Sequence, residues 1–262
     1  MKQGRLRHGG LIGAALLLTA CGSGGGGSSS EPQPPVVNPP PTSDSRACYG
    51  DDQPACNLRT YQVMVESFVD GDGSANYGVG YGPSRHNGDL QGIIDSLDHI
   101  KSLNVNAIWL TPVFDSCAGQ TGDDRLDATG YFACDFFNVD PNFGSNAQLK
   151  KLVEAAHQRG LHVFLDGVFG HVNRVGVSKP SPEGRLPALK SGGAGYPGQL
   201  VDYDQPESLA YFKEVARYWV EQYGIDGWRL DQAYDDGHPF WKDWRRWERS
   251  INPTAYMNAE LD

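Results

Sequence analysis

Two stretches of the chain decide the fold: Gly224-Ile-Asp-Gly-Trp-Arg-Leu-Asp231 and, about thirty residues later, Ala255-Tyr-Met-Asn-Ala-Glu260. Each reads as a short apolar strand that ends in a carboxylate, and the segment between them is long enough for a helix. Strands that follow one another in this way usually pair in parallel, about 4.8 Å apart. We therefore expect Asp231 and Glu260 to lie side by side at neighbouring strand ends.

This pair of carboxylates has a chemical interpretation. Two carboxyl groups about 5 Å apart suit the two-step, retaining cleavage of a glycosidic bond. The alternative is that both are ordinary carboxylates at the ends of loops. Arg229 favours the catalytic interpretation, because it stands two residues before Asp231, faces the same side of the strand and can hold that acid ionised.

Strand and helix patterns alternate along the chain. We predict strands over 61–68, 107–110, 162–166, 225–230 and 255–260, and helices over 89–103, 147–159, 206–223 and 241–249. Near-continuous apolar strands joined by helices indicate a parallel sheet covered on both faces. An open dinucleotide-binding sheet and a closed barrel both fit, but no Gly-x-Gly-x-x-Gly turn follows the first strand.

Acidic residues at the strand ends (Asp166, Asp231, Glu260) favour the closed barrel. The predicted fold class is α/β, a (β/α)8 TIM barrel of which about the first five β/α units are present. Residues 171–205, rich in Gly, Pro and Ser, are predicted to form a short inserted subdomain after the third strand, within a barrel region spanning 47–262.

The N-terminal segment is predicted to lie outside the fold. Residues 1–20 combine a basic head with an apolar run too short to span a bilayer, which is typical of a signal peptide. Leu18-Thr-Ala-Cys21 resembles a bacterial lipobox and implies a lipid on Cys21, although a plain secretory signal is the alternative. Residues 21–46, rich in Gly, Ser and Pro, then form a tether. We expect an exported protein anchored by lipid to a bacterial membrane and facing the periplasm or the exterior.

Cysteine count and charge narrow the remaining possibilities. The four cysteines after Cys21 are an even number in a chain predicted to be exported, which favours disulfides over metal ligation. Three pairings are possible, and the most local one, Cys48–Cys56 with Cys117–Cys134, is our prediction. The formal net charge of −10, without a basic stripe, argues against nucleic acid as a partner and is compatible with a neutral substrate.

Four segments in order resemble the alpha-amylase family of glycoside hydrolases, family thirteen. They are Asp166-Gly-Val-Phe-Gly-His171, Gly227-Trp-Arg-Leu-Asp231, Met257-Asn-Ala-Glu260, and Gly130-Tyr131 followed by the segment 135–144. The resemblance covers Thr60 to Asp262. It implies hydrolysis of α-1,4-glucosidic bonds in starch-like glucans or maltooligosaccharides, with no cofactor needed for the chemistry.

The resemblance also implies roles for individual residues. Asp231 would be the nucleophile, and Glu260 the general acid and base, with a pKa raised by the neighbouring charge of Asp231. His171 would hydrogen-bond sugar hydroxyls and Tyr131 would stack on a sugar ring. Asp166 would contact either Arg229 or the substrate.

Two departures from the family pattern concern a structural calcium and the transition state. Gly170 replaces the family's calcium-binding Asn, and the family's fourth signature, a His-Asp pair, is not in this sequence. A separate calcium site is predicted at Asp70, Asp72, Asn76 and Asp89, since alternating oxygen ligands suit Ca²⁺, with a solvated turn as the alternative.

Other functions and a further aromatic feature stay open at this point. A transglycosylase of the same family, a non-catalytic glycan-binding surface lipoprotein and an inactive fragment are the alternatives to a hydrolase. Trp241, Trp244 and Trp247 recur every three residues, and we predict that they pack a helix on the barrel rather than bind sugar.

Overall fold

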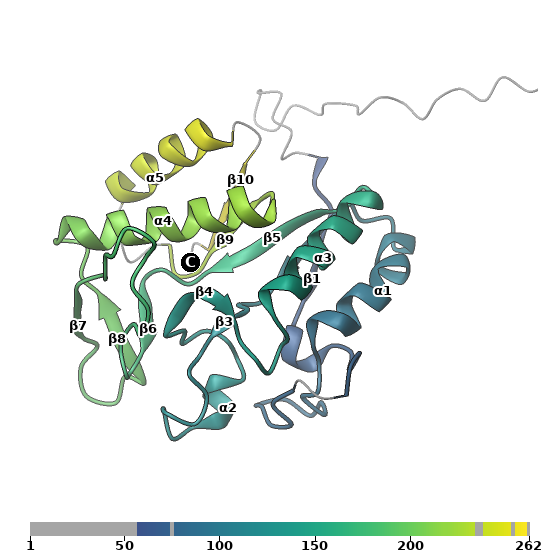
Figure 1. The fold of residues 1–262 in the computed structure, drawn as a ribbon, viewed down its shortest axis with the longest axis horizontal. Coiled ribbons are helices and arrows are strands. Elements are labelled where there is room, and N and C mark those ends of the chain that lie inside the picture. Colours follow the sequence, from purple (N-terminus) through teal and green to yellow (C-terminus); the bar gives the residue numbers. More distant parts are fainter. Residues whose placement is uncertain (1–56, 74–75, 234–237, 253–254, 261–262) are drawn as a thin grey trace, which may run out of the picture. The chain divides into compact units, whose positions relative to one another are not determined.

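The computed structural model describes residues 57–73, 76–233, 238–252 and 255–260. For residues 238–242 it describes the backbone alone. Its centre is one parallel sheet with the strand order β1-β2-β5-β9-β10 (Figure 1). The strands are β1 (Thr60–Val63), β2 (Ala107–Leu110), β5 (His162–Gly167), β9 (Gly227–Leu230) and β10 (Tyr256–Ala259). The spatial order follows the order in the chain, without the reversal of a doubly wound sheet, as successive units of a barrel require.

One long helix separates each consecutive pair of these strands. The helices are α1 (Leu90–Ser102), α3 (Asn146–Gln158), α4 (Pro206–Tyr223) and α5 (His238–Ile251). Side-chain caps begin two of them: Asp89 accepts a hydrogen bond from the Gly92 N–H at 2.6 Å, and Ser145 accepts one from the Gln148 N–H at 3.2 Å. Gly224 ends α4 with a φ of 73°, which favours glycine.

The two faces of the sheet differ in what covers them. Val63, Leu110, Leu165 and Leu230 point outward into a buried core shared with the helices. The inward-facing residues, by contrast, line a cavity of about 490 Å³, and Gln62, Trp109, Phe164 and Arg229 are among its walls. The helices therefore stabilise one face of the sheet, and polar and aromatic side chains occupy the other.

The first strand is shorter than we predict from the sequence. β1 ends at Val63, and residues Val65–Ser67 form a 3-10 turn, η2, instead of continuing the predicted strand to 68. The Val65 N–H donates to Thr111 Oγ1, and Glu66 turns inward to form a buried ion pair with His86. These tertiary contacts draw the backbone out of the sheet.

The segment after β2 contains structure that the sequence patterns do not reveal. A short helix, α2 (Asp124–Asp127), lies between β3 (Phe114–Asp115) and β4 (Asp135–Val139), which pair antiparallel. The predicted disulfide Cys117–Cys134 is present and closes the loop that carries α2. Cys21, Cys48 and Cys56 lie outside the described residues.

The predicted insertion also has a sheet of its own. β6 (His171–Asn173), β7 (Leu189–Ser191) and β8 (Gly198–Val201) form a three-stranded antiparallel sheet in the order β6-β8-β7. Glycine and proline between these short strands hide the alternation that would reveal them. Within the part of the chain that the structure describes, no helix has both the length and the apolar character needed to cross a bilayer.

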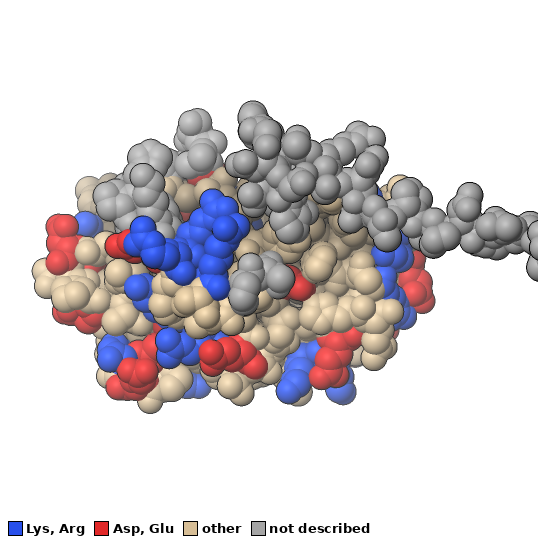
Figure 2. Space-filling model, turned by 90° about the horizontal axis from the view of Figure 1, so that it is seen from above, with Lys and Arg blue, Asp and Glu red and all other residues tan. Residues whose placement is uncertain are grey.

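The tryptophans of α5 divide between core and surface. Trp244 is buried, with its ring centroid 5.2 Å from that of Phe169. Trp247 is half-buried, and Lys213 and Arg217 of α4 lie 5.8 and 5.7 Å from its ring centroid. Figure 2 shows lysine and arginine side chains gathered on this upper side of the molecule. The predicted packing role therefore holds for Trp244 and in part for Trp247, which packs against the same core, and Trp241 lies outside the described side chains.

Candidate active site

One guanidinium group holds three carboxylates together at the ends of three neighbouring strands. Arg229 Nη1 lies 2.9 Å from both oxygens of Asp166 and 2.7 Å from Asp231 Oδ1. Arg229 Nη2 lies 2.8 Å from Glu260 Oε2. The register explains this meeting, because Arg229 pairs with Asp166 of β5 on one side and with Asn258 of β10 on the other. The structure thus brings the two predicted catalytic acids to one cation.

The two acids differ in burial. The side chain of Asp231 is 8% exposed, whereas that of Glu260 is 41% exposed. Burial raises the pKa of Asp231, Arg229 opposes this, and the neighbouring Glu260 adds to it. Asp231 follows β9, which has a neighbour on each side, and Glu260 follows β10, the last strand of the described sheet.

The expected rise in the pKa of Glu260 is wrong for this structure. The Gln232 N–H donates to Glu260 Oε2 at 3.0 Å and, with the charge of Arg229, holds the pKa of this carboxyl below its ordinary value. Burial is too slight to outweigh these contacts. Glu260 is therefore ionised near neutral pH in the described arrangement.

Asp166 connects the carboxylate group to the aromatic side of the site. It is fully buried, and its Oδ2 accepts hydrogen bonds from Tyr131 Oη and Trp109 Nε1, both at 3.2 Å. Burial raises the pKa of Asp166 to about 7, even though the charge of Arg229 acts in the opposite direction. Of the two roles predicted for Asp166, the structure shows the contact with Arg229. Tyr131 stands beside Asp166 with its hydroxyl engaged.

His171 has a buried ring nitrogen without a partner among the described residues. Its Nε2 is buried and makes no hydrogen bond, and its ring packs 4.8 Å from that of Phe132. Burial lowers the pKa of His171 to about 4, so the imidazole is neutral at physiological pH. A neutral ring nitrogen of this kind can donate a hydrogen bond to a hydroxyl group or accept one from it, depending on the tautomer.

Asp89 lies against the 70–73 turn, the other part of the predicted calcium site that the structure describes. Asp89 caps α1, and its other oxygen accepts from the N–H groups of Gly71 and Asp72 at 3.0 and 3.1 Å. Asp70 accepts from the Gly73 N–H at 2.8 Å. Among the described residues, the carboxylates of Asp70, Asp72 and Asp89 do not form a group of three with oxygen atoms within 4.8 Å of one another. Asp89 is thus a helix cap in this structure, and a calcium ion at Asp70, Asp72, Asn76 and Asp89 stays a prediction.

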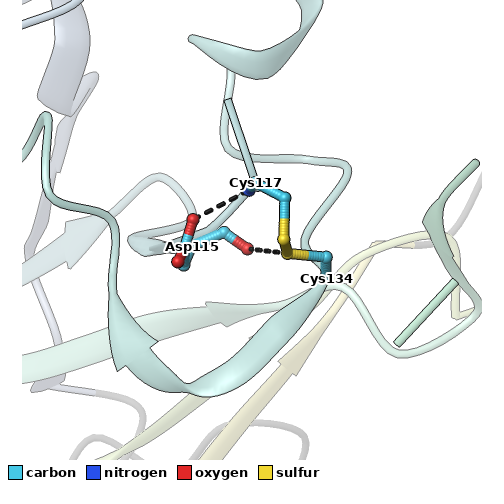
Figure 3. Close-up of side chains that lie close together, drawn as sticks. All are labelled: Asp115, Cys117 and Cys134. Atoms are coloured by element: carbon cyan, nitrogen blue, oxygen red, sulfur yellow. Dashed lines mark hydrogen bonds between the residues drawn. A yellow bond between two sulfur atoms is a disulfide. The ribbon is translucent and has the colours of Figure 1, made fainter. Parts of the chain in front are cut away.

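Among the residues that the structure describes, the one compact group of possible metal ligands is Asp115, Cys117 and Cys134 (Figure 3). The two sulfur atoms are joined as a disulfide, and Asp115 Oδ1 accepts a hydrogen bond from the Cys117 N–H at 2.8 Å. A disulfide has no thiolate to offer a metal. This group is therefore a structural link and not a metal centre.

Sequence reasoning missed two contributors to the site. Trp109 lies under the Arg229 guanidinium, 5.0 Å from its ring centroid, and donates to Asp166. Gln232 contributes only its backbone N–H, with a φ of 48°. A large aromatic residue on the inward face of a predicted strand was a usable signal for Trp109, but no side-chain pattern reveals a backbone donor.

Comparisons with known proteins agree with this geometry. Residues 62–177 match the family model described as alpha amylase, catalytic domain. A cyclomaltodextrinase from Bacillus sp is 35% identical over 77% of this chain and 40% of its own length. Neopullulanase 2 from Thermoactinomyces vulgaris is 32% identical over 77% of this chain and 38% of its length.

Solved structures give the same result. The crystal structure of AmyP in complex with maltose is 52% identical, with a TM-score of 0.70 over 78% of this chain and 42% of that chain. Cyclic α-maltosyl-(1→6)-maltose hydrolase from Arthrobacter globiformis is 29% identical, with a TM-score of 0.64 over 78% of this chain and 51% of that chain. The chain is thus part of a (β/α)8 barrel and spans about two fifths of the curated relatives it matches. It belongs to the alpha-amylase family of glycoside hydrolases, family thirteen.

Proposed function

We propose that this chain supplies the nucleophile and the acid-base group of a retaining glycosidase that cleaves α-1,4-glucosidic bonds in starch-like glucans or maltooligosaccharides. The single observation that carries the proposal is the contact of Arg229 with both Asp231 and Glu260. A separation of about 5 Å suits attack by one carboxylate while the other protonates the leaving oxygen. The names of the relatives, which include cyclomaltodextrinase and neopullulanase, support an α-glucan substrate.

In the first step Asp231 attacks the anomeric carbon while Glu260 gives its proton to the departing glycosidic oxygen. In the second step Glu260 takes a proton from water, and that water releases the sugar from Asp231 with its original configuration. Arg229 keeps Asp231 ionised, which a nucleophile requires. Tyr131 and His171 border the bound sugar, one as a stacking surface and the other as a hydrogen-bond partner.

The acid step needs a proton on Glu260, which is ionised without substrate. We propose that a bound glucan supplies the change. It excludes water from the exposed side of Glu260 and leaves that carboxyl beside the charge of Asp231, and both effects raise the pKa. The half-exposed position of Glu260 supports this view, because its surroundings change most when a ligand covers it.

The test is hydrolysis of maltoheptaose by the wild type and by Asp231→Asn and Glu260→Gln. We expect wild-type release of reducing sugar as the α-anomer, seen by NMR, and a loss of about a thousandfold or more in each variant. Asp98→Asn, an exposed acid paired with Arg159 on the helical side, is the control and should keep full activity. Undiminished hydrolysis by Asp231→Asn, or a β-anomer product, would contradict the mechanism.

The same experiment separates the alternatives. Binding of maltoheptaose without cleavage would indicate a glycan-binding protein, and products longer than the substrate would indicate transglycosylation. We also propose that the mature protein is exported and held at a bacterial membrane by lipid on Cys21, on the strength of the lipobox-like Leu18-Thr-Ala-Cys21. Cys21→Ser should move the protein from the detergent phase to the aqueous phase in a Triton X-114 partition. Equal partition of both forms would contradict the anchor.

A further inference from the structure

Tyr81 is an exposed aromatic side chain held in a fixed orientation. It is 56% exposed, the largest exposed fraction among the exposed large hydrophobic side chains of the described residues. The guanidinium carbon of Arg125 lies 4.8 Å from the ring centroid, and Tyr81 Oη donates to Asp123 Oδ2 at 3.2 Å. One face of the ring thus stacks on a cation while the hydroxyl is fixed at the edge.

The loop that carries Tyr81 is itself fastened at several points. The Gly78 N–H donates to the His86 carbonyl at 2.9 Å, and the His86 ring bonds the Gly82 carbonyl at 3.0 Å. Arg125 Nε donates to the Gly80 carbonyl at 2.8 Å. His86 is in turn paired with the buried Glu66. The ring of Tyr81 therefore presents a surface that loses little conformational freedom when a ligand covers it.

This surface stands at the same end of the barrel as the site. The loop follows β1, and α2, which carries Arg125, follows β2, so both lie beyond the carboxyl ends of strands, where Asp231 and Glu260 also lie (Figure 1). Residues 128–130 are all that separates α2 from Tyr131, which donates to Asp166. Through the bond from Arg125 to the Gly80 carbonyl and this short connection, the Tyr81 loop is joined to the segment that carries Tyr131.

We propose that Tyr81, bordered by Asp123 and Arg125, is a distal binding site for a glucosyl unit of the same α-glucan chain that occupies the site. The apolar face of a pyranose would stack on the open side of the ring. The carboxylate of Asp123 and the guanidinium of Arg125 would accept from and donate to its hydroxyl groups. The inference rests on the proposed function, and it adds a preference for glucans longer than a disaccharide.

The experiment measures binding of maltose and of maltoheptaose to the full chain by calorimetry. An Asp231→Asn background prevents hydrolysis during the titration. Tyr81→Ala should weaken binding of maltoheptaose about five- to tenfold, the effect of losing one stacked aromatic, and leave maltose unchanged. Tyr81→Phe, which keeps the ring, should bind maltoheptaose within about twofold of the parent. Leu103→Ala, 46% exposed at the end of α1 that precedes β2, is the matched control and should change neither affinity.

A second readout is the NMR spectrum of the loop. Amide resonances of residues 78–86 should shift with maltoheptaose and stay in place with maltose. Unchanged affinity for maltoheptaose in Tyr81→Ala, or an equal loss for both sugars, would overturn the distal site while leaving the proposed function in place. A parent protein that binds neither sugar would contradict the proposed function, and the distal site with it.

Discussion

The two halves of the site are built differently. On one side, called the β9 side and formed by β5 and β9, Asp166 and Asp231 are buried and both contact Arg229 Nη1. On the β10 side, Glu260 is half-exposed and takes Nη2 of the same residue together with a backbone N–H. The acid proposed as nucleophile is thus fixed by its surroundings, and the acid proposed to exchange protons is open to change.

The difference shows that the same arginine contributes differently to a buried carboxylate and to an exposed one. A buried carboxylate depends on its cation, because an unpaired charge in the interior is costly. An exposed carboxylate gains little stability from the same contact, since water screens it. We therefore expect the β9 side to determine stability and the β10 side to determine proton transfer. Four experiments can break or sharpen this comparison.

The largest effect should be on activity, in Glu260→Gln. Loss of the proton donor should reduce kcat about a thousandfold or more, while the free energy of unfolding should change by about 0.5 kcal/mol or less. Steady-state kinetics and thermal melts measure the two quantities. A fall in stability as large as that caused by removing Arg229 would show that the exposed half is structural after all.

Arg229→Met should have the largest effect on stability. It leaves Asp166 and Asp231 buried without their cation, so we expect a loss of about 3–5 kcal/mol in the free energy of unfolding. Arg246→Met removes an exposed pair with Asp243 and should cost about 1 kcal/mol or less. Urea denaturation compares the two, and equal losses would remove the distinction between buried and exposed pairs.

The disulfide tests how the aromatic side of the site is held. Replacing Cys117 and Cys134 together by serine opens a loop with a sequence separation of 17 and should cost about 3 kcal/mol. That loop carries Tyr131, so maltose binding should weaken as well. Reduction of the wild type should reproduce both changes. If the double variant binds maltose as the wild type does, the link to Tyr131 is not needed for binding.

Glu248 provides the counterpart of Asp231, a buried carboxyl group on which Arg245 and Arg249 act without forming a hydrogen bond to it. Neither of its oxygens has a hydrogen-bond partner among the described residues, and burial raises its pKa to about 8. Below its unfolded pKa of 4.5 the proton is bound in both states. As pH rises towards 8 only the unfolded state ionises, so stability is lost over this range.

Glu248→Gln should therefore stabilise the protein by up to about 4 kcal/mol at pH 8 and change little near pH 4. Thermal melts across this pH range measure the effect, and Glu154→Gln, an exposed acid on α3, is the control. A gain that does not depend on pH would show that Glu248 ionises alike in both states.

Much of the fold was readable because the periodic signals were strong. The predicted helices 147–159 and 206–223 lie within one residue of α3 and α4, and each of the five central strands was located. Asp166, Asp231 and Glu260 were expected at strand ends, and the structure brings all three to Arg229. A strand order that follows the chain order makes such neighbours predictable.

Other features could not be read in this way, because they depend on contacts between distant segments. The sequence predicts Asp89 as a calcium ligand, and its cap on α1 and its contact with the 70–73 turn were not expected. The early end of β1 depends on Thr111 and on the buried pair Glu66–His86, which are distant in sequence. Local propensity carries no information about such partners.

By itself, the sequence determined the order of the β/α units and the positions of the acids at strand ends, since alternation and strand order are local properties of the chain. Tertiary structure alone decided which acid is buried and which is half-exposed, and hence that the pKa of Asp231 is raised and that of Glu260 lowered. The physical reason is that a pKa depends on the water, charges and donors around a group. Those surroundings come from segments that meet only after folding.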